Sequence, residues 1–202
     1  MMVELFNQIR NCKICIEDAD NPLPHKPNPV VVMSQKAKIV ICGQAPGNRV
    51  NQSGIPFTDP SGDRLRNWLG VDDNVFYDSS IFSIVPMGFC FPGLDKKGGD
   101  LPPRKECAKA WHESVFDSMP QLELFLLVGG YAQKYHLGKA AQKTVTQTVS
   151  NWKEYIDNPI GGNRFLPLPH PSWRNTGWIK KHSFFEEDLL PFLKNEVSKI
   201  LV

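Results

Sequence analysis

Four short runs of apolar, largely β-branched residues do most to limit the fold of this chain. They occupy residues 38–42, 80–85, 122–128 and 165–168. Their length and composition are typical of buried strands. We expect helices over 3–15, 104–118, 142–155 and 183–200, so helical stretches lie before, between and after these runs. Strands that alternate with helices favour a mostly parallel sheet covered on both faces. We therefore expect an α/β fold, a three-layer α/β/α sandwich around a four-stranded sheet.

Size and composition set further limits. The 202 residues suffice for one substantial core but not for two comfortable domains, so we expect a single domain over 1–202. The net charge is +2, so any surface that binds nucleic acid must be a local basic patch. The chain has no apolar run long enough for a membrane span and no signal-peptide pattern. We expect a cytoplasmic protein, of prokaryotic type.

Residues 166–175, Leu-Pro-Leu-Pro-His-Pro-Ser-Trp-Arg-Asn, hold the most informative motif. Prolines on both sides stiffen the backbone around His170, because each fixes φ and removes a donor. Ser172 and Arg174 are natural phosphate ligands, and Trp173 offers a flat apolar surface. A rigidly placed imidazole beside such groups suits an enzyme that stabilises charge on a nucleobase. A proline-rich surface turn with an incidental histidine is the alternative.

The segment from 43 to 62 follows the first predicted strand and is unusually long for a connection. It opens with Gly-Gln-Ala-Pro-Gly, a tight turn whose amides can face a ligand. Phe57 then stands in turn-rich surroundings, where its ring could stack on a flipped base. Asp59 could orient a water or oppose a developing cation, while Asp59 or Ser61 could equally cap the next helix. The segments at 43, 86, 129 and 170 all follow strands, so they should meet at one edge of the sheet.

These motifs, in this order, resemble the uracil-DNA glycosylase superfamily over nearly the whole chain. The likeness is closest to its iron–sulfur branch, the type 4 and type 5 enzymes. The turn at 43–47 resembles their Gly-Glu-Ala-Pro-Gly, and Ala45 stands where the classical enzymes place a water-activating aspartate. The aspartate after Pro-Phe-Thr resembles the type 5 pattern, so the resemblance implies a catalytic role for Asp59.

The resemblance implies a DNA base-excision repair hydrolase that cleaves the N-glycosidic bond of uracil or another deaminated base flipped out of DNA. Catalysis would fall to Asp59 and His170. The residues expected to bind the base are Gly43, Gln44, Ala45 and Phe57. Those expected to bind the DNA that contains the deaminated base are Ser172, Trp173, Arg174 and Asn175.

Five cysteines occur, an odd number that argues against a disulfide framework. In the iron–sulfur branch, four cysteines hold a [4Fe–4S] cluster, and the resemblance gives those positions to Cys12, Cys15, Cys90 and Cys107. A structural zinc site or four reduced, unliganded thiols are the alternatives. Cys42 lies inside a predicted strand and is expected to be a core residue.

One position departs from the type 4 pattern. Type 4 enzymes have an asparagine that reads the uracil edge four residues before the third cysteine, and this chain has Pro86 there. Type 5 enzymes also lack that asparagine and accept several deaminated bases, so the preferred base stays open. Two other functions also stay open: a non-catalytic damaged-DNA-binding protein on the same fold, and a thiol-redox protein that uses Cys12 and Cys15.

Overall fold

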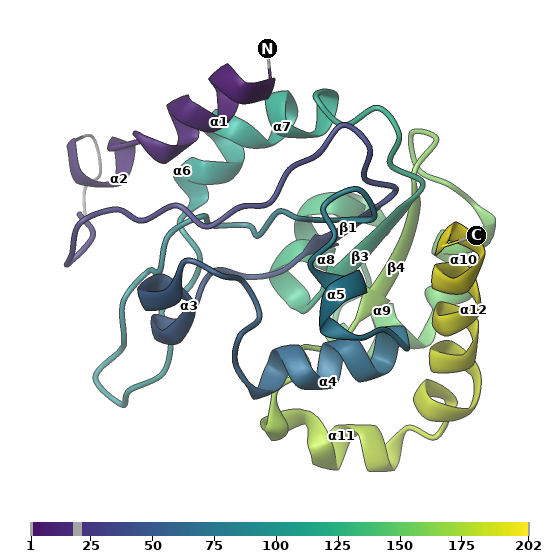
Figure 1. Cartoon of the computed structure of the whole chain (residues 1–202). Helices are drawn as coiled ribbons and strands as arrows, with labels where there is room; N and C mark the ends of the chain where they lie inside the picture. The colour runs from purple at the N-terminus through teal and green to yellow at the C-terminus, as the bar shows by residue number, and fades with distance from the viewer. Residues whose placement is uncertain (1, 18–21, 202) are drawn as a thin grey trace.

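The computed structural model describes residues 2–17 and 22–201. At its centre lies a sheet of four parallel strands in the order β2-β1-β3-β4 (Figure 1). The strands are β1 (Ile39–Cys42), β2 (Phe82–Ile84), β3 (Leu124–Val128) and β4 (Arg164–Leu168). The predicted α/β class and the four-stranded parallel sheet are therefore confirmed.

Helices make every connection between the strands, because parallel neighbours cannot be joined by a tight turn. Before β1 lie α1 (Met2–Arg10) and α2 (Ile14–Glu17). Between β1 and β2 lie α3 (Asn48–Ser53), α4 (Pro60–Leu69) and α5 (Asp73–Phe76). Between β2 and β3, α6 (Lys105–Cys107) and α7 (Glu113–Asp117) flank a π-helical turn, Ala108–His112. Between β3 and β4 lie α8 (Gly130–Leu137), α9 (Val145–Ser150) and α10 (Trp152–Asp157), and after β4 come α11 (Thr176–Lys181) and α12 (Leu190–Leu201).

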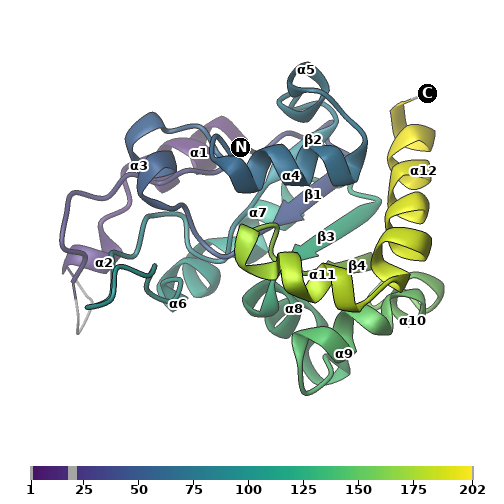
Figure 2. The ribbon, with the colours of Figure 1, turned by 90° about the horizontal axis from the view of Figure 1, so that it is seen from below.

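The strands are buried on both faces, and their alternate side chains enter two separate cores. Ile39 and Ile41 of β1 pack with α4 and α12, through residues such as Leu65 and Leu193. Val40 of β1 packs on the other side, in a core that includes residues of α1, α7 and α8. This follows from the two-residue period of a strand, which sends successive side chains to opposite faces. The result is the three-layer sandwich predicted from the sequence, seen from below in Figure 2.

Three helical segments differ from the sequence prediction. The helix expected over 3–15 is two helices, because the chain turns between Arg10 and Ile14. The helix expected over 142–155 is likewise divided, at Asn151. The connection from 43 to 62 contains α3 and the beginning of α4. Its length therefore reflects added helical structure as well as loop.

All four strands are parallel, so their carboxyl ends lie along one edge of the sheet. The segments that follow β1, β2 and β4 meet at this edge, where α/β proteins generally bind ligands. Among the described residues, none of the helices has both the length and the apolar character needed to cross a lipid bilayer.

Candidate active site

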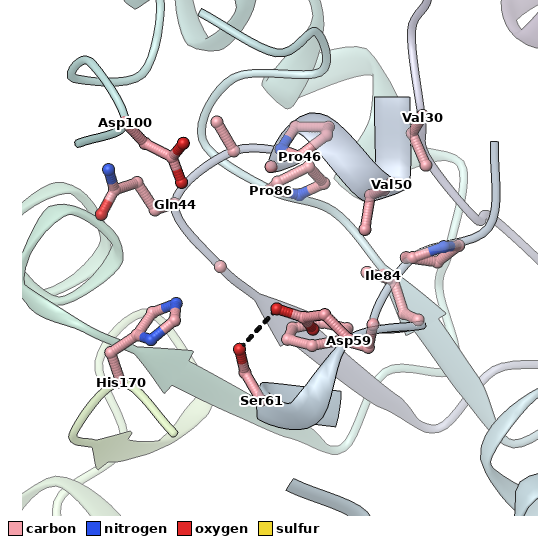
Figure 3. A pocket seen from close by; sticks show the side chains of 15 residues that line it. Val30, Gln44, Pro46, Val50, Asp59, Ser61, Ile84, Pro86, Asp100 and His170 are labelled. Atoms are coloured by element: carbon pink, nitrogen blue, oxygen red, sulfur yellow. Dashed lines mark hydrogen bonds between the residues drawn. The ribbon is translucent and has the colours of Figure 1, made fainter. Parts of the chain in front are cut away.

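A cavity of about 100 Å³ opens at the carboxyl ends of the strands (Figure 3). Its wall brings together the turn after β1, the loop before α4, the end of β2 and the segment after β4. Phe57, Asp59 and His170 all line it, as the sequence predicted for one shared cleft. Gly43, Gln44 and Ala45 line it as well.

The turn at 43–47 is fastened through its carbonyl groups. Met87 N–H donates to the Gly43 carbonyl at 2.9 Å, and Gly88 N–H donates to the Gln44 carbonyl at 3.0 Å. Within the described part of the chain, the N–H groups of Gln44 and Ala45 donate no hydrogen bond. These two amides therefore remain available for an acceptor atom in the cavity.

The backbone of Phe57 is held in an unusual conformation. Its φ is 57°, the one positive φ among the described residues other than glycine, and such a conformation costs roughly 1–3 kcal/mol. Two donors fix its carbonyl oxygen, the Arg66 guanidinium at 3.1 Å and the Tyr77 hydroxyl at 3.3 Å. The ring packs edge-on against Phe76, with centroids 6.0 Å apart. A Cβ built on Gly43 would lie 3.8 Å from the Phe57 ring, so the ring stands beside the first glycine of the turn.

Arg66 can support this loop because it is itself anchored. Its side chain is 10% exposed and forms ion pairs with Asp63 at 2.6 Å and Asp73 at 2.7 Å. The buried guanidinium thus has charged partners as well as the Phe57 carbonyl, as a buried charge requires. The loop that presents the Phe57 ring is in this way tied to both α4 and α5.

Asp59 has two structural roles at once. Its carboxylate caps α4, accepting from Gly62 N–H at 3.3 Å, and it accepts from the Ser61 hydroxyl at 2.7 Å. Both Asp59 and Ser61 also line the cavity. The sequence left open which of the two caps the helix, and the structure assigns the cap to Asp59.

His170 reaches the cavity at the end of β4, between the buried Pro169 and Pro171. Asn175 Nδ2 donates to the His170 carbonyl at 2.7 Å and so braces the loop. Arg64 of α4 adds a second brace, donating to the Ser172 carbonyl at 3.0 Å. Burial lowers the pKa of His170 below its ordinary value, while the carboxylates of Asp59 and Asp100 act against this and favour the charged imidazolium.

The four residues expected to bind DNA, at positions 172–175, differ in their surroundings. Trp173 is 76% exposed, and the Arg174 guanidinium lies 5.9 Å from its ring centroid. The Ser172 hydroxyl accepts from Arg174 N–H at 3.1 Å and so helps to form the turn. The Asn175 amide is used within the protein, on the His170 carbonyl. Trp173 and Arg174 are therefore the members of this set that extend outward from the mouth of the cavity.

Asp100 lines the cavity too, and sequence reasoning missed it. It belongs to a turn between two of the cysteine positions, and no motif distinguishes it. Burial raises the pKa of Asp100 above its usual range, although nearby His170 and Arg174 act in the opposite direction. The side chains of Asp100, Gln44 and His170 lie along one side of the cavity, with Asp59 and Ser61 on another (Figure 3).

The position that departs from the type 4 pattern, Pro86, forms part of the cavity wall. Its carbonyl accepts a hydrogen bond from His112 Nε2 at 3.1 Å. This bond fixes the backbone at Pro86 from the side of the sheet that α1, α7 and α8 cover. The proline ring offers no hydrogen-bonding group to a ligand. The side chain of Pro86 can therefore distinguish bases only by shape and apolar contact.

The four cysteines assigned by the resemblance come together. Cys12, Cys15, Cys90 and Cys107 line one small cavity of their own. Phe89 N–H donates a hydrogen bond to the Cys107 sulfur at 3.3 Å. Residues 18–21, which follow the first pair, lie outside the described residues. Cys42 is fully buried in β1 and packs in the sheet core, as expected.

Whether these cysteines can hold a single metal ion or a larger iron–sulfur cluster depends on the spacing of their sulfur atoms. Among the described residues, no three Cys, His, Asp or Glu side chains are arranged to hold a metal ion. A four-iron cluster is larger than a single ion and needs its thiolates further apart. Four cysteines around one cavity, with no His, Asp or Glu among its lining residues, are compatible with that donor set.

Two comparisons with known proteins concern this chain as a whole. A solved structure similar to this chain is the solution NMR structure of a protein provisionally identified as a uracil DNA glycosylase, from Methanosarcina acetivorans. It is 13% identical, covers 81% of this chain and 95% of its own, and has a TM-score of 0.46. The sequence model of the uracil DNA glycosylase superfamily, whose members act on DNA and hydrolyse N-glycosidic bonds, matches residues 31–194. The matched range contains Phe57, Asp59 and His170. This chain therefore belongs to the uracil DNA glycosylase superfamily.

Proposed function

We propose that this protein excises uracil or another deaminated base from DNA by hydrolysing the N-glycosidic bond of a flipped nucleotide. The observation that carries the proposal is the shared cavity of Phe57, Asp59 and His170 at the carboxyl edge of the sheet. An extruded base would stack on Phe57, a contact worth roughly 1–3 kcal/mol. The N–H groups of Gln44 and Ala45 would donate to its carbonyl oxygens.

Asp59 would act on the sugar side of the bond. As the bond breaks, the sugar gains oxocarbenium character, and a carboxylate nearby opposes that positive charge and positions the attacking water. Its hydrogen bonds with Ser61 and Gly62 fix the orientation of the carboxylate before substrate arrives. The group is thus preorganised on a helix terminus rather than on a mobile loop.

His170 would act on the leaving base. Negative charge develops on the base only as the bond breaks, so a donor placed there stabilises the transition state more than the ground state. Removal of one such donor typically lowers the rate by ~10²–10³. Beyond the cavity, Trp173 would contact the duplex near the gap and Arg174 would pair with a phosphate.

We further propose that the protein accepts several deaminated bases. Pro86 supplies no side-chain hydrogen bond at the position where a type 4 enzyme reads uracil. The test uses duplex oligonucleotides of one sequence that carry uracil, hypoxanthine or xanthine, each followed by cleavage of the abasic site. Excision of two or more of them supports the proposal, whereas excision of uracil alone would support the glycosylase activity and contradict the broad acceptance of bases. Tight binding to lesion DNA with no excision of any would favour the non-catalytic DNA-binding protein instead.

Substitution of Asp59 tests the chemistry directly. Asparagine caps a helix about as well as aspartate, so Asp59→Asn should fold normally while losing the charge that opposes the oxocarbenium. We expect single-turnover excision to fall by about 10² or more, with binding of lesion DNA nearly unchanged. The matched control is Asp72→Asn, because Asp72 also caps a helix, α5, and lies outside the cavity. Excision by Asp59→Asn at the parent rate would remove Asp59 from the mechanism.

His170→Ala gives an independent test of the leaving-group role. We expect the chemical step to slow by about 10²–10³ while the Kd for lesion DNA changes little. His182→Ala serves as the control, because the His182 ring stacks on Trp178 and does not line the cavity. If His170→Ala weakened DNA binding and left the single-turnover rate unchanged, the residue would be a DNA contact instead.

We also propose that Cys12, Cys15, Cys90 and Cys107 hold a [4Fe–4S] cluster. Bound there, the cluster would tie the N-terminal helices to the segment between β2 and β3, because its ligands come from both. Purified anaerobically, the protein should contain about four irons per chain and absorb visible light. Cys90→Ser should abolish both signals, whereas Cys42→Ala, a change in the sheet core, should keep them. Stoichiometric zinc without iron would favour the zinc alternative.

A further inference from the structure

His112 approaches the cavity wall from the side of the sheet opposite α4. It closes the π-helical turn Ala108–His112, and its side chain is buried. Its Nε2 lies 3.1 Å from the Pro86 carbonyl oxygen, and a carbonyl oxygen only accepts, so Nε2 is the nitrogen that bears the proton. Burial lowers the pKa of His112 to about 4, so the ring is neutral and has this one N–H to donate. Nδ1 has no hydrogen-bond partner within the described part of the chain.

The peptide group between Pro86 and Met87 links this imidazole to the residues that line the cavity. Its carbonyl accepts from His112, and its N–H donates to the Gly43 carbonyl at 2.9 Å. The Gly43 carbonyl belongs to the next peptide group of the chain of bonds, whose N–H is that of Gln44. Among the described residues Gln44 N–H donates no hydrogen bond, and Gln44 lines the cavity (Figure 3). A chain of hydrogen bonds therefore runs from the His112 ring through two peptide groups and ends at Gln44 N–H.

We propose that His112 is a positioning residue of this site, whose Nε2–H orients and polarises the Gln44 N–H expected to donate to the flipped base. The proposal rests on the proposed function for what that amide binds; the chain of hydrogen bonds does not depend on it. A peptide group that is bonded at both its carbonyl and its N–H cannot rotate freely. Hydrogen bonds in series also polarise one another, so each bond strengthens the next. A donor held in this way needs no reorganisation when negative charge develops on the base.

Two substitutions separate this hydrogen bond from packing. The His112 ring also stacks on Phe89, with centroids 5.6 Å apart. His112→Phe keeps a ring at this position and removes the donor, whereas His112→Gln removes the ring and keeps an N–H group at the same number of bonds from Cα. A role in the chain of hydrogen bonds predicts that His112→Gln resembles the parent more closely than His112→Phe does. A role in packing alone predicts the reverse order.

The first measurement requires no enzymatic activity. Amide hydrogen exchange is followed by NMR at Met87, with Gly129 N–H, which donates to the Leu168 carbonyl at the same edge of the sheet, as the reference. We expect exchange at Met87 to accelerate about threefold to tenfold in His112→Phe, because its peptide group loses one of its two bonds. In His112→Gln it should stay near the parent rate. His136→Phe is the matched control and should leave Met87 unchanged, because His136 stacks on His112 but its Nε2 has no partner among the described residues.

The second measurement concerns the reaction. Single-turnover excision should fall about tenfold or more in His112→Phe, because the amide that contacts the base shifts. His112→Gln should stay within about threefold of the parent, and in both variants the Kd for lesion DNA should change by a smaller factor than the rate. Excision by His112→Phe at or above the rate of His112→Gln overturns the proposal, and so does equal exchange at Met87 in the two variants.

A third measurement needs no variant. Nitrogen NMR of the parent protein reports which ring nitrogen of His112 bears the proton, and we expect Nε2. A proton on Nδ1 overturns the proposal even if neither variant folds. If the parent excises no base, the proposed function fails, and the ring protonation and the exchange at Met87 still decide whether His112 holds this chain of hydrogen bonds.

Discussion

Gly62 is required by the backbone of Phe57. A Cβ at position 62 would lie 1.8 Å from the Phe57 carbonyl oxygen, an impossible contact with main-chain atoms on both sides. The same oxygen accepts from Arg66 and Tyr77, so it cannot move aside without breaking both bonds. The glycine in the first turn of α4 thus lets the helix approach the loop closely enough for Phe57 to face the cavity.

We therefore expect Gly62→Ala to damage the site and the fold together. The change should lower the free energy of unfolding by about 1–3 kcal/mol, as overpacking of a buried contact does. Excision should fall further than stability explains, because Phe57 must shift. Urea unfolding and single-turnover excision measure the two effects. Gly177→Ala in α11 is the control: nothing lies within 4 Å of a Cβ there, and alanine in a helix should stabilise by about 0.5–1 kcal/mol. A Gly62→Ala protein as stable and active as the parent would contradict this account.

At the level of single residues, the sequence predicted the site residues that a local motif marks. Phe57 and Asp59 stand in a glycine- and proline-rich segment after a strand, and His170 stands between prolines after another, so a shared cleft could be anticipated. Asp100 could not be anticipated, because only the path of the 94–100 turn brings it to the cavity. The use of the Asn175 amide on the His170 carbonyl is likewise a tertiary contact with no sequence signal.

A buried and a half-buried histidine join the helices on the face of the sheet opposite α4. His112, in the π-helical turn before α7, stacks on His136 of α8 with centroids 6.3 Å apart. Burial lowers the pKa of His112 to about 4 and that of His136 to about 3. Within the described part of the chain, His136 Nε2 has no hydrogen-bond partner. Phe116, Phe125 and Phe165 surround the His136 ring.

These values predict a loss of stability in acid. Both folded-state pKa values lie below the value of about 6.5 in the unfolded chain, so the unfolded state binds more protons below that pH. Stability should be complete above about pH 6.5 and should decline toward pH 4, by at most about 1.4 kcal/mol per pH unit for each histidine. His136→Phe, which places a ring among rings, should make this decline shallower. Urea unfolding between pH 7.5 and 4.5 measures the slope. An equal slope in His136→Phe would show that His136 does not titrate on unfolding.

For the elements themselves, strands were easier to predict than short helices. The four strand runs are apolar on both faces and end in glycine or proline, and the structure places a strand in each. α3, α5 and α11 were not predicted, and they have only 6, 4 and 6 residues. Helices this short are not stable alone and form because tertiary contacts hold them. One such contact is the hydrogen bond from Arg64 to Thr176, at the beginning of α11.

The charge of the whole molecule offers little general attraction for DNA. The chain has 23 Lys and Arg against 21 Asp and Glu, so binding must depend on cations near the mouth of the cavity. Arg174 is one of these, exposed beside Trp173. We expect Arg174→Ala to weaken binding to all DNA sequences alike and to reduce the slope of log K against log salt by about 1.

The measurement is a binding titration at several salt concentrations, with lesion and undamaged duplexes. Lys36→Ala removes the same charge from an exposed site just before β1, at the far end of the sheet, and should leave the slope unchanged. A loss restricted to lesion DNA would instead place Arg174 in recognition of the damaged base.

The position of β4 ties two parts of the proposed reaction to one edge of the sheet. Among the described strands, β4 lies at an edge and pairs with β3, and Pro167 within it contributes no N–H to the ladder. Leu166 and Leu168 of β4 are nevertheless fully buried in the core. His170, Trp173 and Arg174 all follow this strand directly. A warmed molecule that released β4 would therefore lose the expected leaving-group donor and the expected DNA contacts together, so binding and excision should disappear in one thermal transition.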